Sequence, residues 1–155
     1  IIALCVNRFV LVNAEIPSGS MENTIMTGDR VFGNRLAYIF GEPKRFDIII
    51  FRYPDDEKQL FIKRIIGLPG ETVEIHDGQI FIDGSKTPLK DVTTKEFMQG
   101  SFGPYTVPDN CYFVMGDNRN NSKDSRYWEH TFVTDDEIVG KAFLRYWPLN
   151  KIKFL

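Results

Sequence analysis

Short apolar runs alternate with turn residues along most of the chain. β-Branched and aromatic residues dominate the runs R-F-V-L-V-N-A, R-V-F-G-N-R, F-D-I-I-I-F-R-Y, Q-L-F-I-K-R-I-I, T-V-E-I, Q-I-F-I, C-Y-F-V-M and K-A-F-L-R-Y. Runs of this kind, bounded by Gly, Pro, Asn and Asp, are typical of β-strands. The pattern therefore predicts a mostly β protein.

Turn and cap residues predict the smaller features. The segment V-E-I-H-D-G-Q-I-F-I predicts a β-hairpin, because Asp77 and Gly78 suit a tight turn between two strands. Helix signals are few: M-E-N-T-I-M after Ser20 favours a single turn, and T-D-D-E-I-V after Val133 favours a short capped helix. Neither helix is expected to organise the fold.

Length and composition favour one folded domain. The chain has 155 residues, of which 43% are hydrophobic and 14% aromatic, so it can bury one sizeable core. From about residue 76 to residue 108 the composition shifts toward Gly, Pro, Thr, Lys and Asp. This shift predicts a more exposed inserted subdomain within a domain that spans residues 13–155.

Residues 1–12 allow more than one interpretation. Their apolar run, I-I-A-L-C-V-N-R-F-V-L-V, is interrupted at Asn7 and Arg8 and is shorter than the roughly 20 residues that a membrane-spanning helix needs. The segment is either the remnant of an N-terminal membrane anchor or juxtamembrane strand, with Arg8 at the membrane surface, or a buried first strand.

Charge and metal-ligating residues exclude several classes of function. Nineteen basic and 21 acidic side chains give a net charge of -2, and the basic residues are scattered, so no nucleic-acid partner is expected. Cys5 and Cys111 fit neither a redox pair nor a zinc site, and only two histidines are present. No metal and no cofactor are predicted.

The polar segment G-D-N-R-N-N-S-K-D-S-R superficially suggests a calcium-binding loop. Counted from Asp117, however, Arg119, Ser122 and Trp128 stand where such a loop needs an oxygen ligand, Gly and Glu. We expect instead that Arg119 and Arg126 form charge-assisted hydrogen bonds with the loop's own carboxylates, Asp117 and Asp124.

The serines of the segment I-P-S-G-S-M are candidates for nucleophilic catalysis. A serine hydroxyl is a poor nucleophile near neutral pH, so it needs a base to accept its proton. His76 lies in the predicted turn and His130 in a loop-like stretch, where histidines are commonly solvated. Lys63 is the better candidate, because strand alternation places it on one face with Phe61 and Ile65, and burial lowers a lysine pKa. The alternative is an edge strand on which Lys63 and its neighbour extend into water.

The segment I-P-S-G-S-M adds the groups that would stabilise a developing oxyanion. Gly19 has no side chain, so the backbone can approach a substrate, and the Ser20 amide and the Ser18 hydroxyl can both donate hydrogen bonds. Ser122 is a candidate to hydrogen-bond the lysine amine. An ordinary Pro-Ser-Gly-Ser turn is the alternative.

Taken together, the segments resemble bacterial type I signal peptidases, which are membrane-anchored serine peptidases that remove signal peptides from exported proteins. P-S-G-S-M-x-x-T resembles the nucleophile segment, K-R-I-I-G-L-P-G-E the base segment, and G-D-N-R-N-N-S-x-D-S-R the third active-site box. The likeness covers residues 13–140 approximately. Asn23 is a departure, because many family members have Pro at that position.

The resemblance implies both a fold and a set of site residues. The fold would consist of coiled antiparallel β-sheets that form a catalytic core, with a smaller inserted β subdomain and few short helices. Ser20 would be the nucleophile and Lys63 the general base, with Ser18 and the Ser20 amide as the oxyanion hole. The expected lysine-positioning and loop residues are Ser122, Asp124 and Arg126, and the expected substrate-binding residues are Ile16, Pro17, Met21, Ile25, Phe61 and Ile62.

The resemblance also implies partners and a location. The substrate would be the signal-peptide region of an exported precursor, cleaved after a small residue in an A-x-A pattern. The enzyme would lie at the cell membrane with its catalytic domain on the extracytoplasmic side, in contact with the lipid surface. Trp128 and Trp147 are candidates for an apolar face against the bilayer, although a core position is the simpler expectation.

Two other functions fit parts of the pattern. Self-cleaving repressor peptidases use a serine-lysine pair on a related β scaffold, but this chain contains neither a helix-turn-helix region nor an internal Ala-Gly cleavage site. A non-enzymatic β module that binds peptides or membranes is the second alternative. It would leave the combination of Ser20, Lys63 and Ser122 without a purpose.

Overall fold

The computed structural model describes residues 10–91 and 96–155. Its strands are β1 (Leu11–Glu15), β2 (Arg30–Asn34), β3 (Ile48–Tyr53), β4 (Asp56–Gly67), β5 (Thr72–His76), β6 (Gln79–Ile82), β7 (Phe102–Thr106), β8 (Cys111–Met115), β9 (Val133–Thr134), β10 (Ile138–Trp147) and β11 (Lys153–Phe154). Its helical segments are three short 3-10 turns, η1 (Gly19–Met21), η2 (Asp135–Glu137) and η3 (Leu149–Lys151). The predicted mostly β fold with few short helices is confirmed.

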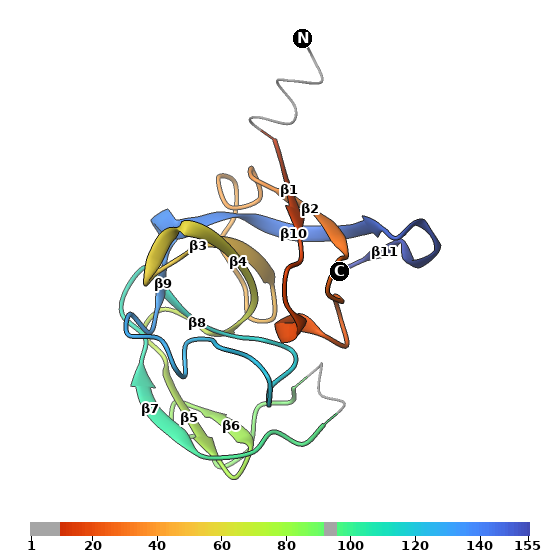
Figure 1. Ribbon diagram of the computed structural model, residues 1–155. Helices are drawn as coiled ribbons and strands as arrows, with labels where there is room; N and C mark the ends of the chain where they lie inside the picture. The colour runs from red at the N-terminus through yellow and green to blue at the C-terminus, as the bar shows by residue number, and fades with distance from the viewer. Residues whose placement is uncertain (1–9, 92–95) are drawn as a thin grey trace.

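The larger sheet is antiparallel and strongly curled (Figure 1). Its strand order is β1-β2-β10-β3-β4-β8-β9, and β11 pairs with β10 outside this path. Although three strands separate β1 from β4 in this order, residues of both strands line one cavity. The curl therefore brings the end strand β1 over the middle of the sheet.

A smaller antiparallel sheet, in the order β6-β5-β7, lies at the opposite end of the molecule from β1 and β2 (Figure 1). It contains the predicted hairpin, with His76 opposite Gln79 and a turn in which Asp77 and Gly78 both have positive φ, 46° and 78°. The first strand of the smaller sheet, β5, begins at Thr72. The sheet therefore starts a few residues before residue 76, where the composition of the sequence begins to shift.

Strand β4 is buried on both faces in its second half, because it contributes to three apolar clusters. Ile62 packs with the β1 and β2 side chains, Ile65 with those of β3 and β8, and Ile66 with those of the smaller sheet. Lys63 and Arg64 lie between these residues and are themselves buried. The half of β4 that carries the candidate base is thus enclosed in the core.

Several local predictions are confirmed. The segment after Val133 forms η2, where the Thr134 amide donates to the Glu137 carboxylate at 2.8 Å. Near Ser20 the helical turn begins at Gly19, slightly earlier than predicted. Residues 1–9, which include Cys5, lie outside the described residues, whereas Leu11–Glu15 form β1. Trp128 is in the core, and Trp147 is 47% exposed.

We predict that Gly78→Ala destabilises the protein by about 3 kcal/mol, because it combines a strained backbone with a clash. Gly78 has a positive φ of 78°, and a Cβ there would overlap the carbonyl oxygen of Met98. Gly84→Ala is the matched control, since Gly84 also has a positive φ, 67°, but no atom lies within 4 Å of the added Cβ. It should cost only about 1 kcal/mol. Urea unfolding measures both, and equal losses would contradict the clash.

Candidate active site

The turn that carries Ser18 and Ser20 is fixed at both ends. After β1 ends, Ile16 exchanges backbone hydrogen bonds with Asp29 and Gly28, at 3.0 and 2.8 Å. Met21 and Ile25 are fully buried beneath the turn, and the Ile25 amide donates to the Met21 carbonyl at 2.8 Å. These apolar anchors hold the serines at the surface of the core.

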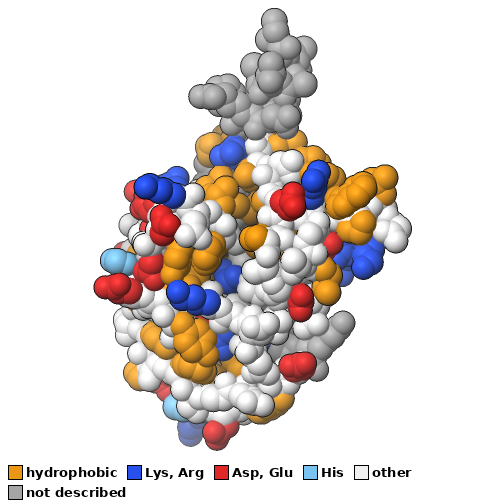
Figure 2. All heavy atoms as spheres, in the orientation of Figure 1, with side chains coloured by type: hydrophobic (Ala, Val, Ile, Leu, Met, Phe, Trp, Pro, Cys, Tyr) orange, Lys and Arg blue, Asp and Glu red, His pale blue; other side chains and the backbone are white. Residues whose placement is uncertain are grey.

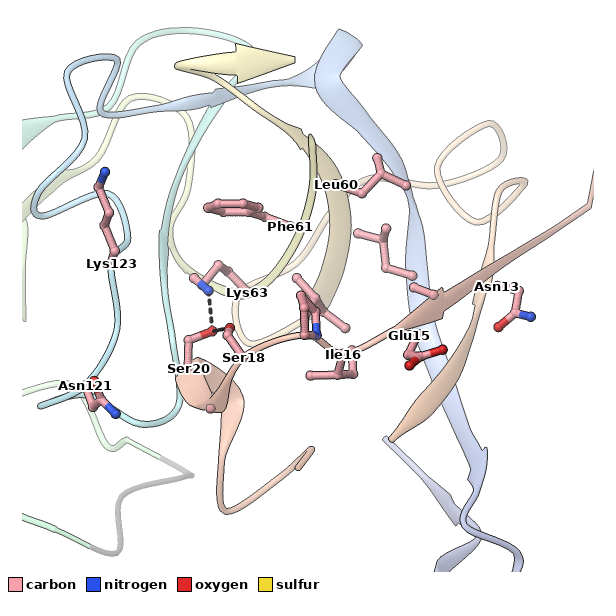
Figure 3. Close-up of a pocket in the computed structure, with 15 residues that line it drawn as sticks. Asn13, Glu15, Ile16, Ser18, Ser20, Leu60, Phe61, Lys63, Asn121 and Lys123 are labelled. Atoms are coloured by element: carbon pink, nitrogen blue, oxygen red, sulfur yellow. Dashed lines mark hydrogen bonds between the residues drawn. The ribbon is translucent and has the colours of Figure 1, made fainter. Parts of the chain in front are cut away.

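Ser20 and Lys63 meet directly in this structure. The Lys63 Nζ donates a hydrogen bond to Ser20 Oγ at 2.5 Å, although 43 residues separate the two in sequence. The Ser18 hydroxyl lies beside them and donates to Ser20 Oγ at 3.4 Å. Figure 3 shows the three side chains converging at one end of the cavity.

Burial changes the protonation of the lysine. Lys63 is only 3% exposed, and desolvation lowers the pKa of its amine from 10.5 to about 8. The carboxylates of Asp124 and Asp117 act in the opposite direction, but their attraction for the ammonium is the smaller effect. At a pH near 8, about half of the Lys63 side chains are therefore deprotonated and uncharged.

A cavity of about 550 Å³ opens from this pair between β1 and β4 (Figure 3). Its lining consists of Asn13, Ala14, Glu15, Ile16, Pro17, Ser18, Gly19, Ser20, Ile50, Leu60, Phe61, Ile62, Lys63, Asn121 and Lys123. Four of the six expected substrate-binding residues, Ile16, Pro17, Phe61 and Ile62, are among them. Met21 and Ile25 are not, because both are enclosed in the core below the cavity floor.

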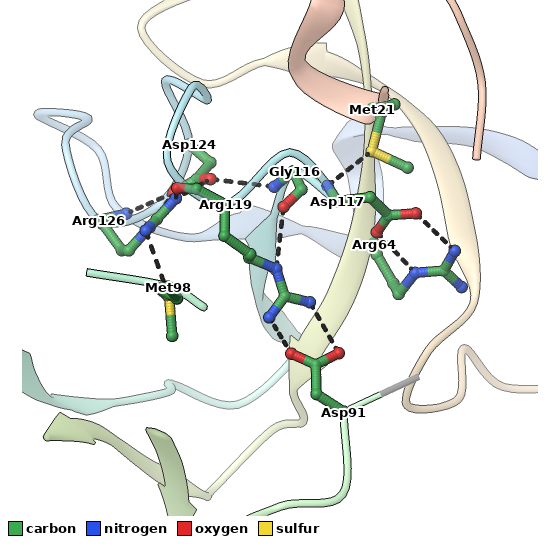
Figure 4. A network of polar contacts seen from close by, with 9 residues as sticks. All are labelled: Met21, Arg64, Asp91, Met98, Gly116, Asp117, Arg119, Asp124 and Arg126. Atoms are coloured by element: carbon green, nitrogen blue, oxygen red, sulfur yellow. Dashed lines mark hydrogen bonds and ion pairs between the residues drawn. The ribbon is translucent and has the colours of Figure 1, made fainter. Parts of the chain in front are cut away.

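The third active-site segment is braced by ion pairs, as Figure 4 shows. Arg126 pairs with Asp124 through Nε and Nη2, at 2.8 and 2.9 Å, and Asp124 also accepts from the Gly116 amide at 2.9 Å. The expected pairing within the loop is wrong for Arg119, which contacts Asp91 from the inserted region instead of Asp117.

Asp117 pairs with Arg64, the residue that follows the candidate base on β4. Arg64 donates to both Asp117 oxygens at 2.8 and 2.7 Å, and Thr24 donates to Asp117 at 2.5 Å (Figure 4 shows the Arg64 pair). The Asp117 amide also contacts the Met21 sulfur at 3.4 Å. This cluster joins the turn that carries Ser20, the strand that carries Lys63 and the third segment. Sequence reasoning missed it, because nothing in the spacing pairs Arg64 with a residue so far along the chain.

Ser122 lies close to the site without a hydrogen bond. Its hydroxyl is shielded from solvent and has no partner among the described residues, so the expected bond to Lys63 is absent here. A Cβ at Gly116 would overlap both Ser122 Oγ and the Ser20 carbonyl oxygen. Gly116 is thus required for the three segments to approach one another, a role that the sequence did not reveal.

Neither histidine takes part in this site. His76 is largely exposed and contacts Glu74, and His130 is largely exposed and contacts Asp55. Among residues 10–91 and 96–155 no group of His, Cys, Asp and Glu side chains could hold a metal ion. Within the same ranges no helix has the length and apolar character needed to cross a membrane.

The departure at Asn23 has a conformational consequence. Asn23 has a φ of 87°, and the Thr24 amide donates to the Met21 carbonyl across the turn at 3.1 Å. Proline is restricted to a φ near -65°, so it could not adopt this turn. Asparagine tolerates positive φ better than most residues, which explains its presence here.

The geometry defines a class of enzyme. A neutral lysine amine within hydrogen-bond distance of a serine hydroxyl can accept its proton and so make the serine a nucleophile. The pair lies at one end of an open cavity that apolar and polar side chains line together. These are the properties of a serine peptidase.

Comparison with known proteins places the chain in a family of such peptidases. Residues 1–147 match the family described as Signal peptidase, peptidase S26. The chain is 39% identical to Signal peptidase I of Leptolyngbya laminosa, over 98% of this chain and 76% of that protein. It is 37% identical to Signal peptidase I T of Bacillus subtilis (strain 168), over 99% and 82% of the two chains.

A solved structure agrees with these sequence relatives. The crystal structure of a signal peptidase I from Enterococcus faecalis V583 matches with a TM-score of 0.53 and 38% identity, over 64% of this chain and 95% of that one. The chain therefore belongs to the signal peptidase family, peptidase S26, whose members are serine endopeptidases that remove signal peptides.

We predict that Lys63→Met raises stability at pH 7 and that the advantage shrinks as pH rises. The folded-state pKa of Lys63, about 8, lies below its ordinary 10.5, so the unfolded chain binds more protons between these values and the native protein gains stability as pH rises through them. The methionine variant lacks this dependence. The difference in unfolding free energy between Lys63→Met and the native protein should narrow by on the order of 2 kcal/mol between pH 7 and pH 10.

Urea unfolding at several pH values measures this difference. Lys58→Met, which removes an exposed lysine from the same strand, controls for surface effects of the substitution. A Lys63→Met advantage that stays constant from pH 7 to pH 10 would show that the amine is not desolvated in the native state.

Proposed function

We propose that this chain cleaves exported precursors at the end of their signal peptides, with Ser20 as nucleophile and Lys63 as general base. The observation that carries the proposal is the 2.5 Å hydrogen bond between Lys63 Nζ and Ser20 Oγ in a desolvated position. Membership of the signal peptidase family supports the choice of substrate.

The reaction would proceed through an acyl-enzyme. Neutral Lys63 accepts the Ser20 proton while Ser20 Oγ attacks the scissile carbonyl carbon, and the carbonyl π electrons move to its oxygen. Collapse of this tetrahedral intermediate breaks the C–N bond, and the Lys63 ammonium returns the proton to the leaving amine. Lys63 then takes a proton from water while the water oxygen attacks the ester carbonyl carbon. The second tetrahedral intermediate collapses by breaking the bond to Ser20 Oγ, and the Lys63 ammonium returns the proton to Ser20 Oγ.

The proposed oxyanion hole consists of the Ser20 amide and the Ser18 hydroxyl. Ser18 is exposed and lies 3.4 Å from Ser20 Oγ, so its hydroxyl can rotate toward an oxygen that develops beside the nucleophile. Donors positioned in advance in this way stabilise charge that appears only in the transition state.

The open edge of β1 would receive the substrate. β1 is the end strand of its sheet and pairs with β2 on one side only, while Asn13, Ala14 and Glu15 line the cavity on the other. An extended peptide can add to such an edge as another strand. The apolar walls formed by Ile16, Phe61 and Ile62 would then accept small apolar side chains of the A-x-A type near Ser20.

The remaining site residues are proposed to position these groups. Asp124 and Arg126 hold the third segment in shape through their ion pair. Ser122 would position the Lys63 amine once a substrate closes the site, since its shielded hydroxyl has a hydrogen bond to offer. We treat residues 13–155 as the catalytic domain and the region of about 76–108 as its inserted subdomain.

The decisive test is cleavage of a peptide that carries an Ala-x-Ala signal-peptide end. We expect the native protein to cut after the last Ala and kcat/KM to rise with pH through an apparent pKa near 8, because the base must lose its proton first. Ser20→Ala and Lys63→Ala should lose more than about 1,000-fold in rate.

As a control, circular dichroism of Ser20→Ala and Lys63→Ala should match that of the native protein, which would show that each variant is folded. The rival β binding module would be favoured if the native protein bound the peptide without cutting it, with or without detergent. Full activity of either variant would remove that residue from the mechanism.

We further propose that the protein works at the lipid surface on the extracytoplasmic side of the cell membrane, as its family membership suggests. Four exposed apolar side chains lie at the end of β10, in the turn that follows and in β11, and they form what we call the hairpin patch: Trp147, Leu149, Ile152 and Phe154. Figure 2 shows apolar side chains gathered over this projecting end, with basic ones beside them. Aromatic and apolar groups next to lysines favour the membrane interface.

A triple variant tests the lipid contact. Replacing Leu149, Ile152 and Phe154 by serine should weaken binding to vesicles of phosphatidylglycerol and phosphatidylethanolamine by more than about tenfold, because most of the apolar area of the hairpin patch is lost. Phe97→Ser, which alters another 71% exposed apolar residue, is the control. Equal sedimentation of all three proteins with vesicles would contradict the proposed contact.

A further inference from the structure

Asn118 makes two contacts with the turn that carries Ser20. Its backbone amide donates to the Ser20 carbonyl at 3.0 Å, and its side-chain Nδ2 donates to the Gly19 carbonyl at 3.0 Å. The Gly19 carbonyl also accepts from the Glu22 amide at 3.0 Å. The carbonyl groups on both sides of Ser20 are therefore held in fixed directions.

The direction of the Gly19 carbonyl determines the direction of the Ser20 amide. The two groups share the peptide unit between Gly19 and Ser20, and in a planar trans peptide the C=O and N–H bonds point in opposite directions. The only cis bonds among the described residues precede Pro104 and Pro148, so this peptide is trans. Fixing the oxygen on one side thus fixes the N–H on the other.

The two sides of this peptide open into different spaces. Asn118 lines a small recess of about 100 Å³ together with Glu22 and Asp117, and it is not part of the lining of the larger cavity. Gly19 and Ser20 do line the larger cavity. With the Gly19 oxygen held toward Asn118, the Ser20 N–H is directed away from the recess and toward the cavity.

The Ser20 amide is available as a donor in that direction. Ser20 is the second residue of η1, and the first N–H groups of a helical turn have no partner within it. Within residues 10–91 and 96–155 no acceptor takes a hydrogen bond from this amide. A peptide that is free to rotate would spend part of its time with the N–H turned out of the cavity, whereas one held at its oxygen does not.

We propose that Asn118 is a positioning residue that aims the Ser20 amide at the oxyanion. This inference rests on the proposed serine mechanism and adds the group that orients one of its two oxyanion donors. Asn118 itself does not touch substrate in this arrangement. It acts through the Gly19 carbonyl, from the side of the turn opposite the reaction.

The role predicts a specific kinetic change. Asn118→Ala should lower kcat by about 10- to 100-fold, less than the loss of a whole oxyanion donor, while KM changes by less than about threefold. The pH dependence of Asn118→Ala should still show an apparent pKa near 8, because the burial of Lys63 is unchanged. The backbone contact from Asn118 to Ser20 remains in every variant.

A variant of the same shape separates aiming from packing. Asn118→Asp fills the same space, but an ionised carboxylate cannot donate to the Gly19 carbonyl. It should therefore lose kcat at least as strongly as the alanine variant. Rates are compared on the alkaline plateau, where Lys63 is neutral in each protein, so that the added charge does not alter the comparison.

Asn120→Ala is the matched control from the same segment. The Asn120 side chain also bridges backbone groups, accepting from Gln99 and donating to Phe97, but it does not contact the nucleophile turn. Its kcat should stay close to that of the native protein.

A peptide aldehyde tests the oxyanion directly. Ser20 Oγ adds to the aldehyde carbon, the π electrons move to the aldehyde oxygen, and the Ser20 proton passes to Lys63. Both Asn118 variants should bind this aldehyde more weakly in proportion to their loss of kcat/KM. The corresponding alcohol, which cannot form an oxyanion, should bind all variants equally.

The outcomes are distinct from those that test the mechanism itself. If the native protein is active, Ser20→Ala is inactive and Asn118→Asp keeps its full kcat, the aiming role is wrong and the serine mechanism stands. If the Asn118 variants lost affinity for both the aldehyde and the alcohol, the aiming role would also be wrong, because general disruption of the site would then explain the lower kcat. If the native protein is inactive, the proposed function has failed first.

Discussion

The structure depends above all on keeping one lysine amine out of water next to a serine hydroxyl. Lys63 achieves this because β4 lies between three apolar clusters, to which Ile62, Ile65 and Ile66 each contribute. Desolvation of an ammonium is costly, and the molecule accepts this cost at the position where a neutral amine is chemically useful. The enclosure of β4 is therefore a functional constraint as well as a source of stability.

Burying this strand also buries the charge next to Lys63. The Arg64 guanidinium cannot lose its proton, so it needs a partner, and Asp117 provides one through two hydrogen bonds. The same carboxylate accepts a hydrogen bond from Thr24, which lies shortly after Ser20 in the chain. The Arg64–Asp117 pair, required by burial, thus links the segment that carries Ser20 to the strand that carries Lys63.

The two carboxylates near Lys63 would be expected to restore its charge. Asp124 and Asp117 do raise the amine pKa, but each is paired with its own guanidinium, from Arg126 and Arg64. Such pairing reduces the field of each carboxylate at the amine, so desolvation remains the dominant effect. The inserted region adds a further support, because Asp91 holds Arg119, whose Nε donates to the Gly116 carbonyl at 2.9 Å.

The sequence alone determined the mostly β fold and the Asp77–Gly78 hairpin, because strand alternation and turn propensity are local properties. It pointed to Ser20 and Lys63 through the resemblance to a family, since residue chemistry by itself left other interpretations open, and the structure brings these two side chains together. Only the tertiary structure decided that Met21 and Ile25 lie below the cavity, that Arg119 turns to Asp91, that Ser122 is left without a bond and that Asn118 holds the Gly19 carbonyl. These depend on how the curled sheet brings distant segments together, and no local pattern encodes that geometry.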